Sequence, residues 1–267
     1  MQKSLFENEM LNIPPNPIFL IARVSHSTLV NADCFDIFHL IADKSVDAII
    51  ADLPYGTTQN KWDSVLPLDE LWKQYKRILK DNGLAVLFAS QPFTSALIMS
   101  NTKEYKYNWV WDKVNKFSGH LNAKKQPLRI TEDICIFYSQ QPTYNPIMVK
   151  GEPYKATSKG GKSSSFGKQT DGVTTINEGW YYPKNIISIK GDERGTEGRI
   201  HPTQKPVELM EYLIKTYTNE NEIVLDNAMG SGTTGLACLK TNRQFIGIEK
   251  EKQYYDVAVQ RLSSYCG

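Results

Sequence analysis

Two short segments carry side chains that could do chemistry, and each follows an apolar run. The first is Asp52-Leu53-Pro54-Tyr55, in which the Asp52 carboxylate and the Leu53 carbonyl can accept two hydrogen bonds from one exocyclic amino group. This pairing draws the nitrogen toward tetrahedral geometry and turns its lone pair outward. Pro54 stiffens the turn, and the Tyr55 ring can stack on an extruded base, a contact worth roughly 1–3 kcal/mol. The segment predicts a clamp for an amino group on a flat ring, with an ordinary strand-ending turn as the alternative.

The second segment, Asp226–Gly232, leads into a predicted helix near the end of the chain. Its glycines, Gly230 and Gly232, let the backbone approach a ligand closely, and the helix that opens at Thr233 offers free N–H groups. Glu249 ends the next predicted strand, roughly 20 residues later, where an acid can bind both hydroxyls of a ribose. The segment lacks the lysine-containing pattern of triphosphate sites. It therefore predicts a site for an adenosyl cofactor without phosphates, although a tight strand-to-helix turn alone would also favour glycine.

The elements that must position these segments alternate strand and helix at both ends of the chain. Apolar runs predict strands at residues 27–30, 46–51, 84–89, 222–225 and 244–249. Helical spacing of apolar residues predicts helices at 35–41, 68–79, 91–99, 206–217 and 233–240, the second of which should end at the glycine signal Asp81-Asn82-Gly83. Residues 107–111 and 134–138 predict two further strands that can form an antiparallel edge. The alternation predicts a doubly wound α/β fold with a mostly parallel sheet.

The chain divides into four parts. Residues 1–22 are proline-rich and predict an irregular N-terminal arm, residues 23–138 the catalytic part, and residues 199–267 the cofactor-binding part. Between them, periodicity fails over residues 139–198, so we expect an irregular insertion. A structureless stretch of this length inside a compact enzyme is usually functional or mobile.

The charge of the chain is concentrated in one region. The net charge is only +2, but from Lys103 to Lys168 we count twelve Lys or Arg against five Asp or Glu, interleaved with aromatic residues. Such a mixture suits a phosphate backbone with unstacked bases, although a solvated charged face is an equal alternative. The best candidates for phosphate contacts are Lys116, Lys124, Lys125 and Arg129.

Cysteine usage and hydropathy predict a cytoplasmic protein. The four cysteines form no C-x-x-C pair, so we expect reduced thiols, with neither disulfides nor a structural metal. No apolar run approaches the roughly 20 residues that span a bilayer, and the N-terminus has no signal-peptide layout. We expect no association with a membrane.

The chain resembles the β group of the amino DNA methyltransferases in four stretches that occur in the order typical of that group: Asp52–Gly56, His201–Pro206, Leu225–Gly235 and Phe245–Glu249. Together they extend the resemblance over most of residues 24–262. The resemblance implies S-adenosylmethionine as methyl donor and double-stranded DNA as substrate. It also implies a sheet of the S-adenosylmethionine-dependent methyltransferase type with a circularly permuted motif order. The irregular insertion takes the place of the target recognition region.

The resemblance assigns roles to single residues. Asp52 would accept the target amine and Tyr55 would stack on the base, while Glu249 would hold the ribose. Asp33, with its neighbour Cys34, would meet the adenine of the cofactor. The cofactor loop would comprise Asp226, Asn227, Ala228, Gly230, Ser231, Gly232 and Thr233, and Thr203 and Lys205 would lie beside the cofactor.

Two departures from the family pattern concern rigidity and packing. Leu53 replaces the usual proline after the first acid, and Asn227-Ala228 replaces the usual Pro-Phe after the strand-ending acid. Neither change removes a donor or acceptor that the chemistry requires, so we expect an active enzyme.

Asp rather than Ser at position 52 favours adenine N6 over cytosine N4 as the target within this resemblance. Methylation of RNA or of a protein amide, and a DNA-binding module without catalysis, are the remaining alternatives. The resemblance also allows a homodimer and a cognate restriction endonuclease in a bacterial or phage-infected cell.

Overall fold

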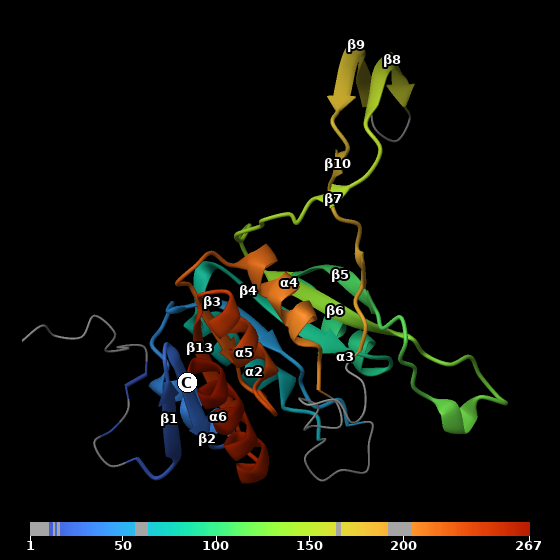
Figure 1. Ribbon diagram of the computed structural model, residues 1–267. Helices are drawn as coiled ribbons and strands as arrows, with labels where there is room; N and C mark the ends of the chain where they lie inside the picture. The colour runs from blue at the N-terminus through green and yellow to red at the C-terminus, as the bar shows by residue number, and fades with distance from the viewer. Residues whose placement is uncertain (1–10, 13, 15–16, 57–63, 164–166, 192–203) are drawn as a thin grey trace, which may run out of the picture. The chain divides into compact units, whose positions relative to one another are not determined.

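The computed structural model describes residues 11–12, 14, 17–56, 64–163, 167–191 and 204–267 (Figure 1). The chain forms two compact units. One comprises the chain up to Asn145 together with Asn185–Gly267, and the other comprises Pro146–Lys184. The candidate site lies entirely within the first unit, so that unit is treated in more detail.

The described residues of the first unit form a nine-stranded mixed sheet. Its strands in spatial order are β1 (Leu20–Val24), β2 (Ser27–Asn31), β13 (Gln244–Glu249), β12 (Ile223–Asp226), β3 (Val46–Ala51), β4 (Leu79–Ala89), β6 (Thr131–Tyr138), β5 (Tyr105–Asp112) and β11 (Ile186–Ser188). From β2 to β4 every neighbouring pair is parallel. The four residues of β12 and most of β3 are buried, as expected for strands covered on both faces.

Helices cover both faces of this sheet, which confirms the doubly wound α/β fold. On one face lie α1 (Cys34–Ile37), α2 (Leu68–Ile78) and α3 (Phe93–Ser100); on the other lie α4 (Val207–Tyr217), α5 (Thr233–Lys240) and α6 (Lys252–Cys266). The alternation of β4 shows the two sides directly, because Val86 and Phe88 join the core under α4 and α5 while Ala85 and Leu87 join the core under α2. Figure 1 shows α4, α5 and α6 together in orange and red.

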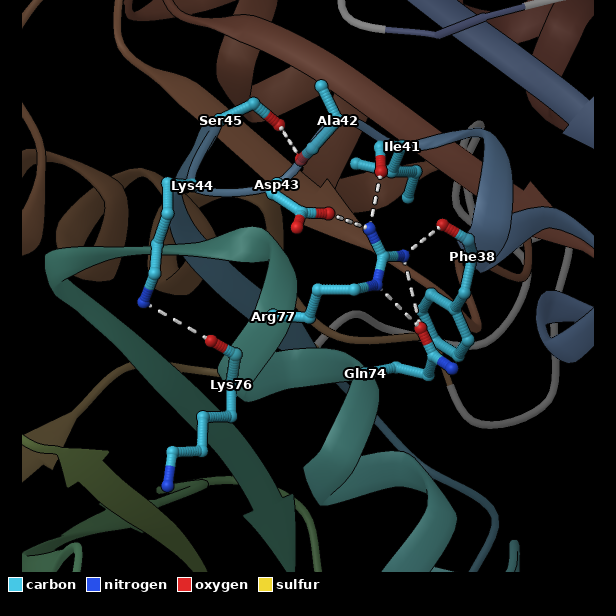
Figure 2. Close-up of polar contacts among 9 residues, drawn as sticks. All are labelled: Phe38, Ile41, Ala42, Asp43, Lys44, Ser45, Gln74, Lys76 and Arg77. Atoms are coloured by element: carbon cyan, nitrogen blue, oxygen red, sulfur yellow. Dashed lines mark hydrogen bonds and ion pairs between the residues drawn. The ribbon is translucent and has the colours of Figure 1, made fainter.

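A single arginine ties α2 to the connection that leads into β3 (Figure 2). The Arg77 guanidinium donates to the backbone oxygens of Phe38 (2.5 Å) and Ile41 (2.9 Å), and it pairs with the Asp43 carboxylate at 2.5 Å. Because Arg77 presents several donors in a fixed plane, it holds three points of that connection at once. This anchoring fixes the start of β3, the strand that delivers Asp52 to the site.

The expected end of the second helix at Gly83 is wrong. The helix α2 ends at Ile78, and the chain enters β4 at Leu79 without a glycine cap. Gly83 instead lies inside β4, where an added Cβ would approach the backbone oxygens of Lys80 and Asp47 to 3.0 and 3.1 Å. Gly83 therefore allows the neighbouring backbone to approach β4 closely, and it does not form the end of the helix.

The first strand and the last helix of the first unit have no counterpart in the expectations from sequence. β1 begins at Leu20, inside the expected arm, because a turn at Ser25 (φ 53°) folds it back antiparallel onto β2. The C-terminal helix α6 packs Tyr255, Ala258 and Leu262 into the core. Those three apolar positions follow helical spacing and would have indicated the helix.

The expectation of an irregular insertion over residues 139–198 is also wrong. The second unit contains a hairpin of β8 (Tyr154–Ser163) and β9 (Gly167–Asn177), and a short pair of β7 (Val149–Lys150) and β10 (Trp180–Tyr181). Its described side chains are mostly exposed, and the Thr157 and Thr174 hydroxyls lie 3.0 Å apart across the hairpin. Hydrophobic periodicity therefore cannot reveal these strands. After this unit, β11 returns to the main sheet at residue 186.

Candidate active site

Four acidic residues from distant parts of the chain come together at one edge of the sheet. Asp33, Glu249, Asp226 and Asp52 end or follow β2, β13, β12 and β3, which are four adjacent parallel strands. The carboxyl ends of parallel strands open into a crevice where ligands bind in α/β folds. A cavity of about 660 Å³ lies at this edge, and all four acids line it.

The cavity brings together most of the residues that the sequence singled out. Its lining includes Asp33, Cys34, Asp52, Leu53, Pro54, Tyr55, Lys205, Asp226, Asn227, Ala228, Gly230, Ser231, Thr233 and Glu249. Gly232 is not part of the lining, and Thr203 lies outside the described residues. Of the four basic candidates, Lys116 and Arg129 line the cavity. Lys124 and Lys125 lie exposed on the loop that follows the short 3-10 helix η2 (His120–Asn122).

The Asp52 carboxylate is already engaged on both oxygens. Oδ1 accepts a hydrogen bond from the Tyr55 hydroxyl at 2.6 Å, and Oδ2 accepts one from Lys205 Nζ at 2.5 Å. Burial, together with the carboxylates of Asp52 and Glu132, raises the pKa of Tyr55 well above its usual value, so the phenol keeps its proton and donates it. Each carboxylate oxygen has a second lone pair, which an amino group can use.

One face of the Tyr55 ring is covered. It stacks on Phe93 with ring centroids 5.2 Å apart and an interplanar angle of 23°. A base can therefore stack on Tyr55 only from the opposite side, which limits the direction from which a flat ring can reach Asp52.

Lys205 was expected to lie beside the cofactor. The structure shows in addition that it contacts Asp52 of the amino-group clamp directly. Its ammonium group lies between Asp52 Oδ2 (2.5 Å) and Glu132 Oε2 (3.3 Å), and its side chain is only 7% exposed. Burial alone would lower the pKa of Lys205, but the two carboxylates outweigh it and raise the pKa, so the lysine stays charged. Glu132 and its second partner, Lys113, are site residues that no sequence motif indicated.

Asp226 organises the cofactor loop from within. Its Oδ1 accepts from the Ala228 N–H at 3.1 Å and its Oδ2 from the Thr234 hydroxyl at 2.6 Å. Burial raises the pKa of Asp226 from 3.8 to about 7, against the opposing effect of these two hydrogen bonds. The next residue, Asn227, is held by the Tyr75 hydroxyl (2.5 Å) and lies 3.8 Å from Cys34 Sγ. The amide thus fixes the loop where the family has a proline.

The acids expected on the ribose and the adenine also shape the backbone around them. Glu249 accepts from the N–H groups of Gly230 (2.9 Å) and Glu251 (2.8 Å), and its burial raises its pKa. Asp33 caps α1 by accepting from the Phe35 N–H at 3.0 Å and pairs with Lys250 at 3.0 Å. Every one of these oxygens retains acceptor capacity for ligand hydroxyl or amino groups.

Within the described ranges, no group of three His, Cys, Asp or Glu side chains could hold a metal ion. Cys34, Cys135 and Cys238 are buried free thiols, and Cys266 is exposed. Burial raises the pKa of Cys34 to about 12, so its thiol stays neutral where it lines the cavity. No helix of the described chain is long and apolar enough to cross a membrane.

Comparison with known proteins identifies the family to which this geometry belongs. A family model described as DNA methylase, covering N6 and N4 methyltransferases, matches residues 46–260. The chain belongs to this DNA methylase family. The match spans β3 to α6 and so includes the amino-group clamp, the second unit and the cofactor loop of the methylase.

Relatives of this DNA methylase cover nearly its whole length. It is 28% identical over 248 residues to the type II methyltransferase M1.MboII of Moraxella bovis, covering 85% of this chain and 92% of that protein. The crystal structure of an M1.HpyAVI–SAM complex is 29% identical, with a TM-score of 0.61, and the match covers 88% of this chain and 99% of that one. The cytosine-N4-specific PvuII DNA methyltransferase, 14% identical with a TM-score of 0.64, covers 91% of this chain and 93% of its own and shares the fold.

Two glycines of the cofactor loop should respond differently to alanine. Gly230 (φ 51°) lines the cavity and has open space around an added Cβ, so Gly230→Ala should cost roughly 1–2 kcal/mol of stability and weaken S-adenosylmethionine binding about tenfold. Gly232 (φ 76°) would place its Cβ 2.9 Å from Ala258 Cβ, so Gly232→Ala should cost roughly 2–5 kcal/mol. Urea unfolding and calorimetric titration of the folded fraction measure both. The opposite ranking in stability would contradict this account of the loop.

Asp226 should make stability fall as the pH rises. Because its pKa is raised from 3.8 to about 7 on folding, the folded protein binds more protons than the unfolded chain between these values. The free energy of unfolding should therefore decline through this window, and Asp226→Asn should make the decline shallower and stabilise the protein at pH 8 by up to a few kcal/mol. Urea unfolding at pH 5 to 8 tests this, with the exposed Asp36→Asn as control for the loss of one carboxylate. Parallel pH curves for wild type and Asp226→Asn would refute it.

Proposed function

We propose that this methylase transfers a methyl group from S-adenosylmethionine to N6 of an adenine flipped out of duplex DNA. The supporting observation is that the clamp residue Asp52 and the loop acids Asp226 and Glu249 line one cavity of about 660 Å³. That volume falls in the range of about 300–1,000 Å³ of small-molecule sites. The preference for adenine over cytosine N4 depends on Asp rather than Ser at position 52.

The residues at the cavity fit S-adenosylmethionine, which supplies a methyl group on a positively charged sulfur. Glu249 can accept from ribose hydroxyls with the lone pairs that its two backbone N–H contacts leave free. Asp33 lines the same cavity and can meet the adenine, as the resemblance implies. At Gly230 nothing lies within 4 Å of an added Cβ, so the loop leaves space for a ligand close to its backbone.

The clamp activates the amino group without a strong base. Asp52 and the Leu53 carbonyl would accept hydrogen bonds from its two N–H groups, so the nitrogen lone pair would be turned away from these acceptors. With S-adenosylmethionine bound as methyl donor, the Asp52 carboxylate would stabilise the positive charge that develops on the nitrogen as it takes up the methyl group, and the nitrogen would then lose a proton to solvent. No covalent enzyme intermediate forms, and positioning provides most of the acceleration. The base must first leave the duplex, since the nitrogen is otherwise buried in pairing.

Asp52→Ala should lower methyl transfer by at least about 10²-fold while S-adenosylmethionine binding persists, because the variant loses the acceptor that orients the amine. The measurement is transfer from labelled S-adenosylmethionine to unmethylated duplex DNA, with nucleoside analysis of the product. The exposed Asp36→Asn is the matched control for loss of a carboxylate.

Each outcome of this measurement decides between the alternatives. N6-methyladenine from the wild type and almost none from Asp52→Ala is the expected result. N4-methylcytosine would keep the family chemistry and overturn the base assignment. Label on RNA or on a protein amide, with none on DNA, would show that the substrate is RNA or protein. Binding of cofactor and DNA without transfer would favour a DNA-binding module.

DNA contact is proposed to involve two regions with different tasks. Lys116 and Arg129 line the cavity beside the clamp, and Lys124 and Lys125 are exposed on the same loop, which suits contacts to phosphates near the flipped base. The second unit, within the predicted 139–198 insertion, is proposed as the target recognition region. The homodimer, the cognate restriction endonuclease and the cytoplasmic location stay predictions.

Changes in these two regions should have different effects on DNA binding. The double variant Lys124→Ala/Lys125→Ala should weaken binding to all DNA sequences alike and reduce the slope of log affinity against log salt by up to about two. Replacing residues 155–176 with a Gly-Ser turn between the paired Tyr154 and Asn177 should instead abolish preference for one sequence. Titration of specific and random duplexes at several salt concentrations, with the exposed Lys76→Ala as control, measures both. A wild-type salt slope in the lysine variant, or retained preference without the hairpin, would contradict the assignment.

A further inference from the structure

A chain of ion pairs leads from the amino-group clamp into the neighbouring strands. Lys205 Nζ contacts Asp52 Oδ2 at 2.5 Å and Glu132 Oε2 at 3.3 Å, and Lys113 Nζ contacts Glu132 Oε1 at 2.5 Å. The side chains of Lys205, Lys113 and Glu132 are only 7, 12 and 16% exposed. Two positive and two negative charges therefore alternate along the wall of the cavity, and the three least exposed of them depend most on their neighbours for compensation.

The proposed chemistry favours a rearrangement of this chain. Asp52 can accept the target amino group on a lone pair that Tyr55 and Lys205 leave free, but the ammonium group of Lys205 then lies close to the reacting nitrogen. Its positive charge opposes the positive charge that develops on that nitrogen. A longer contact between Lys205 and Asp52 during the reaction would relieve this repulsion, and the buried ammonium would then need another partner.

The Glu132 carboxylate is in position to be the new partner of the Lys205 ammonium group. Its Oε2 is buried and accepts no hydrogen bond from any described residue at ordinary geometry, yet it lies 3.3 Å from Lys205 Nζ. An approach of about 0.5 Å would convert this contact into a normal charged hydrogen bond. Burial alone would raise the pKa of Glu132, but Lys205 and Lys113 outweigh burial and lower it, so the carboxylate is ionised when the lysine arrives.

We propose that Lys205 transfers its hydrogen bond from Asp52 to Glu132 when the target amino group binds. Glu132 is then a positioning residue, which acts on the reacting amino group through Lys205. The inference rests on the proposed function, since the transfer is needed only if Asp52 accepts an amine. The role of Lys113 is to keep Glu132 ionised and oriented through the 2.5 Å contact to Oε1.

The test is the single-turnover rate of DNA methylation at saturating S-adenosylmethionine and DNA. Glu132→Gln keeps the shape of the side chain and removes its charge, so it should slow methyl transfer at least tenfold while the affinities for both substrates change less than twofold. In a Lys205→Met background, where no charge has to move, the same substitution should change the rate less than twofold. Glu132→Asp, which keeps the charge, should recover part of the loss.

Several results would overturn the inference. Glu132→Gln within twofold of the wild-type rate would do so, as would an equal loss in the two backgrounds, because a purely structural role does not depend on Lys205. If Glu132→Gln does not fold, which urea unfolding would reveal, Lys113→Met tests the same step because it removes the charge that keeps Glu132 ionised. A wild-type rate of methyl transfer in Lys113→Met would then contradict the inference. A wild type without any DNA methylation would instead refute the proposed function itself.

Discussion

The parallel pairing of β12 with β3 is the constraint on which the site depends. The pairing sets Leu225 beside Ile49, so the two strands end next to each other and present Asp226 and Asp52 at the same edge. These aspartates lie far apart in sequence, and no local interaction could bring them together. Because β13 and β2 extend the same parallel run, Glu249 and Asp33 join them by the same geometry. The sheet thus places the acids of the proposed cofactor site and of the proposed amine clamp in one cavity.

The concentration of acids at this edge has an electrostatic consequence. Asp226 and Glu249 are buried, and burial raises the pKa of each, while backbone N–H groups and a hydroxyl offset part of the cost. Asp52 obtains its compensation differently, from the Lys205 ammonium. Its hydrogen-bond partners are therefore side chains, which can move, whereas the loop acids are held largely by backbone groups. This difference suits the proposed roles, in which the cofactor loop keeps its shape and Asp52 exchanges hydrogen-bond partners.

The cofactor loop shows how the fold accommodates a departure from the family pattern. At the position of the usual proline, Asn227 gains a hydrogen bond from the buried Tyr75 hydroxyl of α2 at 2.5 Å. The Asn227 amide thereby connects the loop to α2. This helix is itself anchored by Arg77, which donates to the backbone oxygen of Phe38. Rigidity that the family obtains from a proline ring is supplied here by a tertiary hydrogen bond.

The sequence by itself determined the elements and the motifs. Buried strands such as β3 and β13 and amphipathic helices such as α2 follow from local periodicity, because burial on one or both faces is imprinted on the order of apolar residues. The clamp and the glycine loop were recognisable because the chemistry of each depends on consecutive residues. The hairpin of the second unit was not, because its described side chains are mostly exposed and leave no alternation of buried apolar residues to recognise.

Only the tertiary structure decided which charged groups meet. Lys205, Glu132 and Lys113 come from three segments with no shared motif, and their contact depends on the register of β5 and β6 and on the approach of the chain that precedes α4. Ion pairs of this kind are set by distances across the sheet, which leave no periodic trace in sequence. The contact between Asp52 and Lys205 therefore could not be predicted from the sequence.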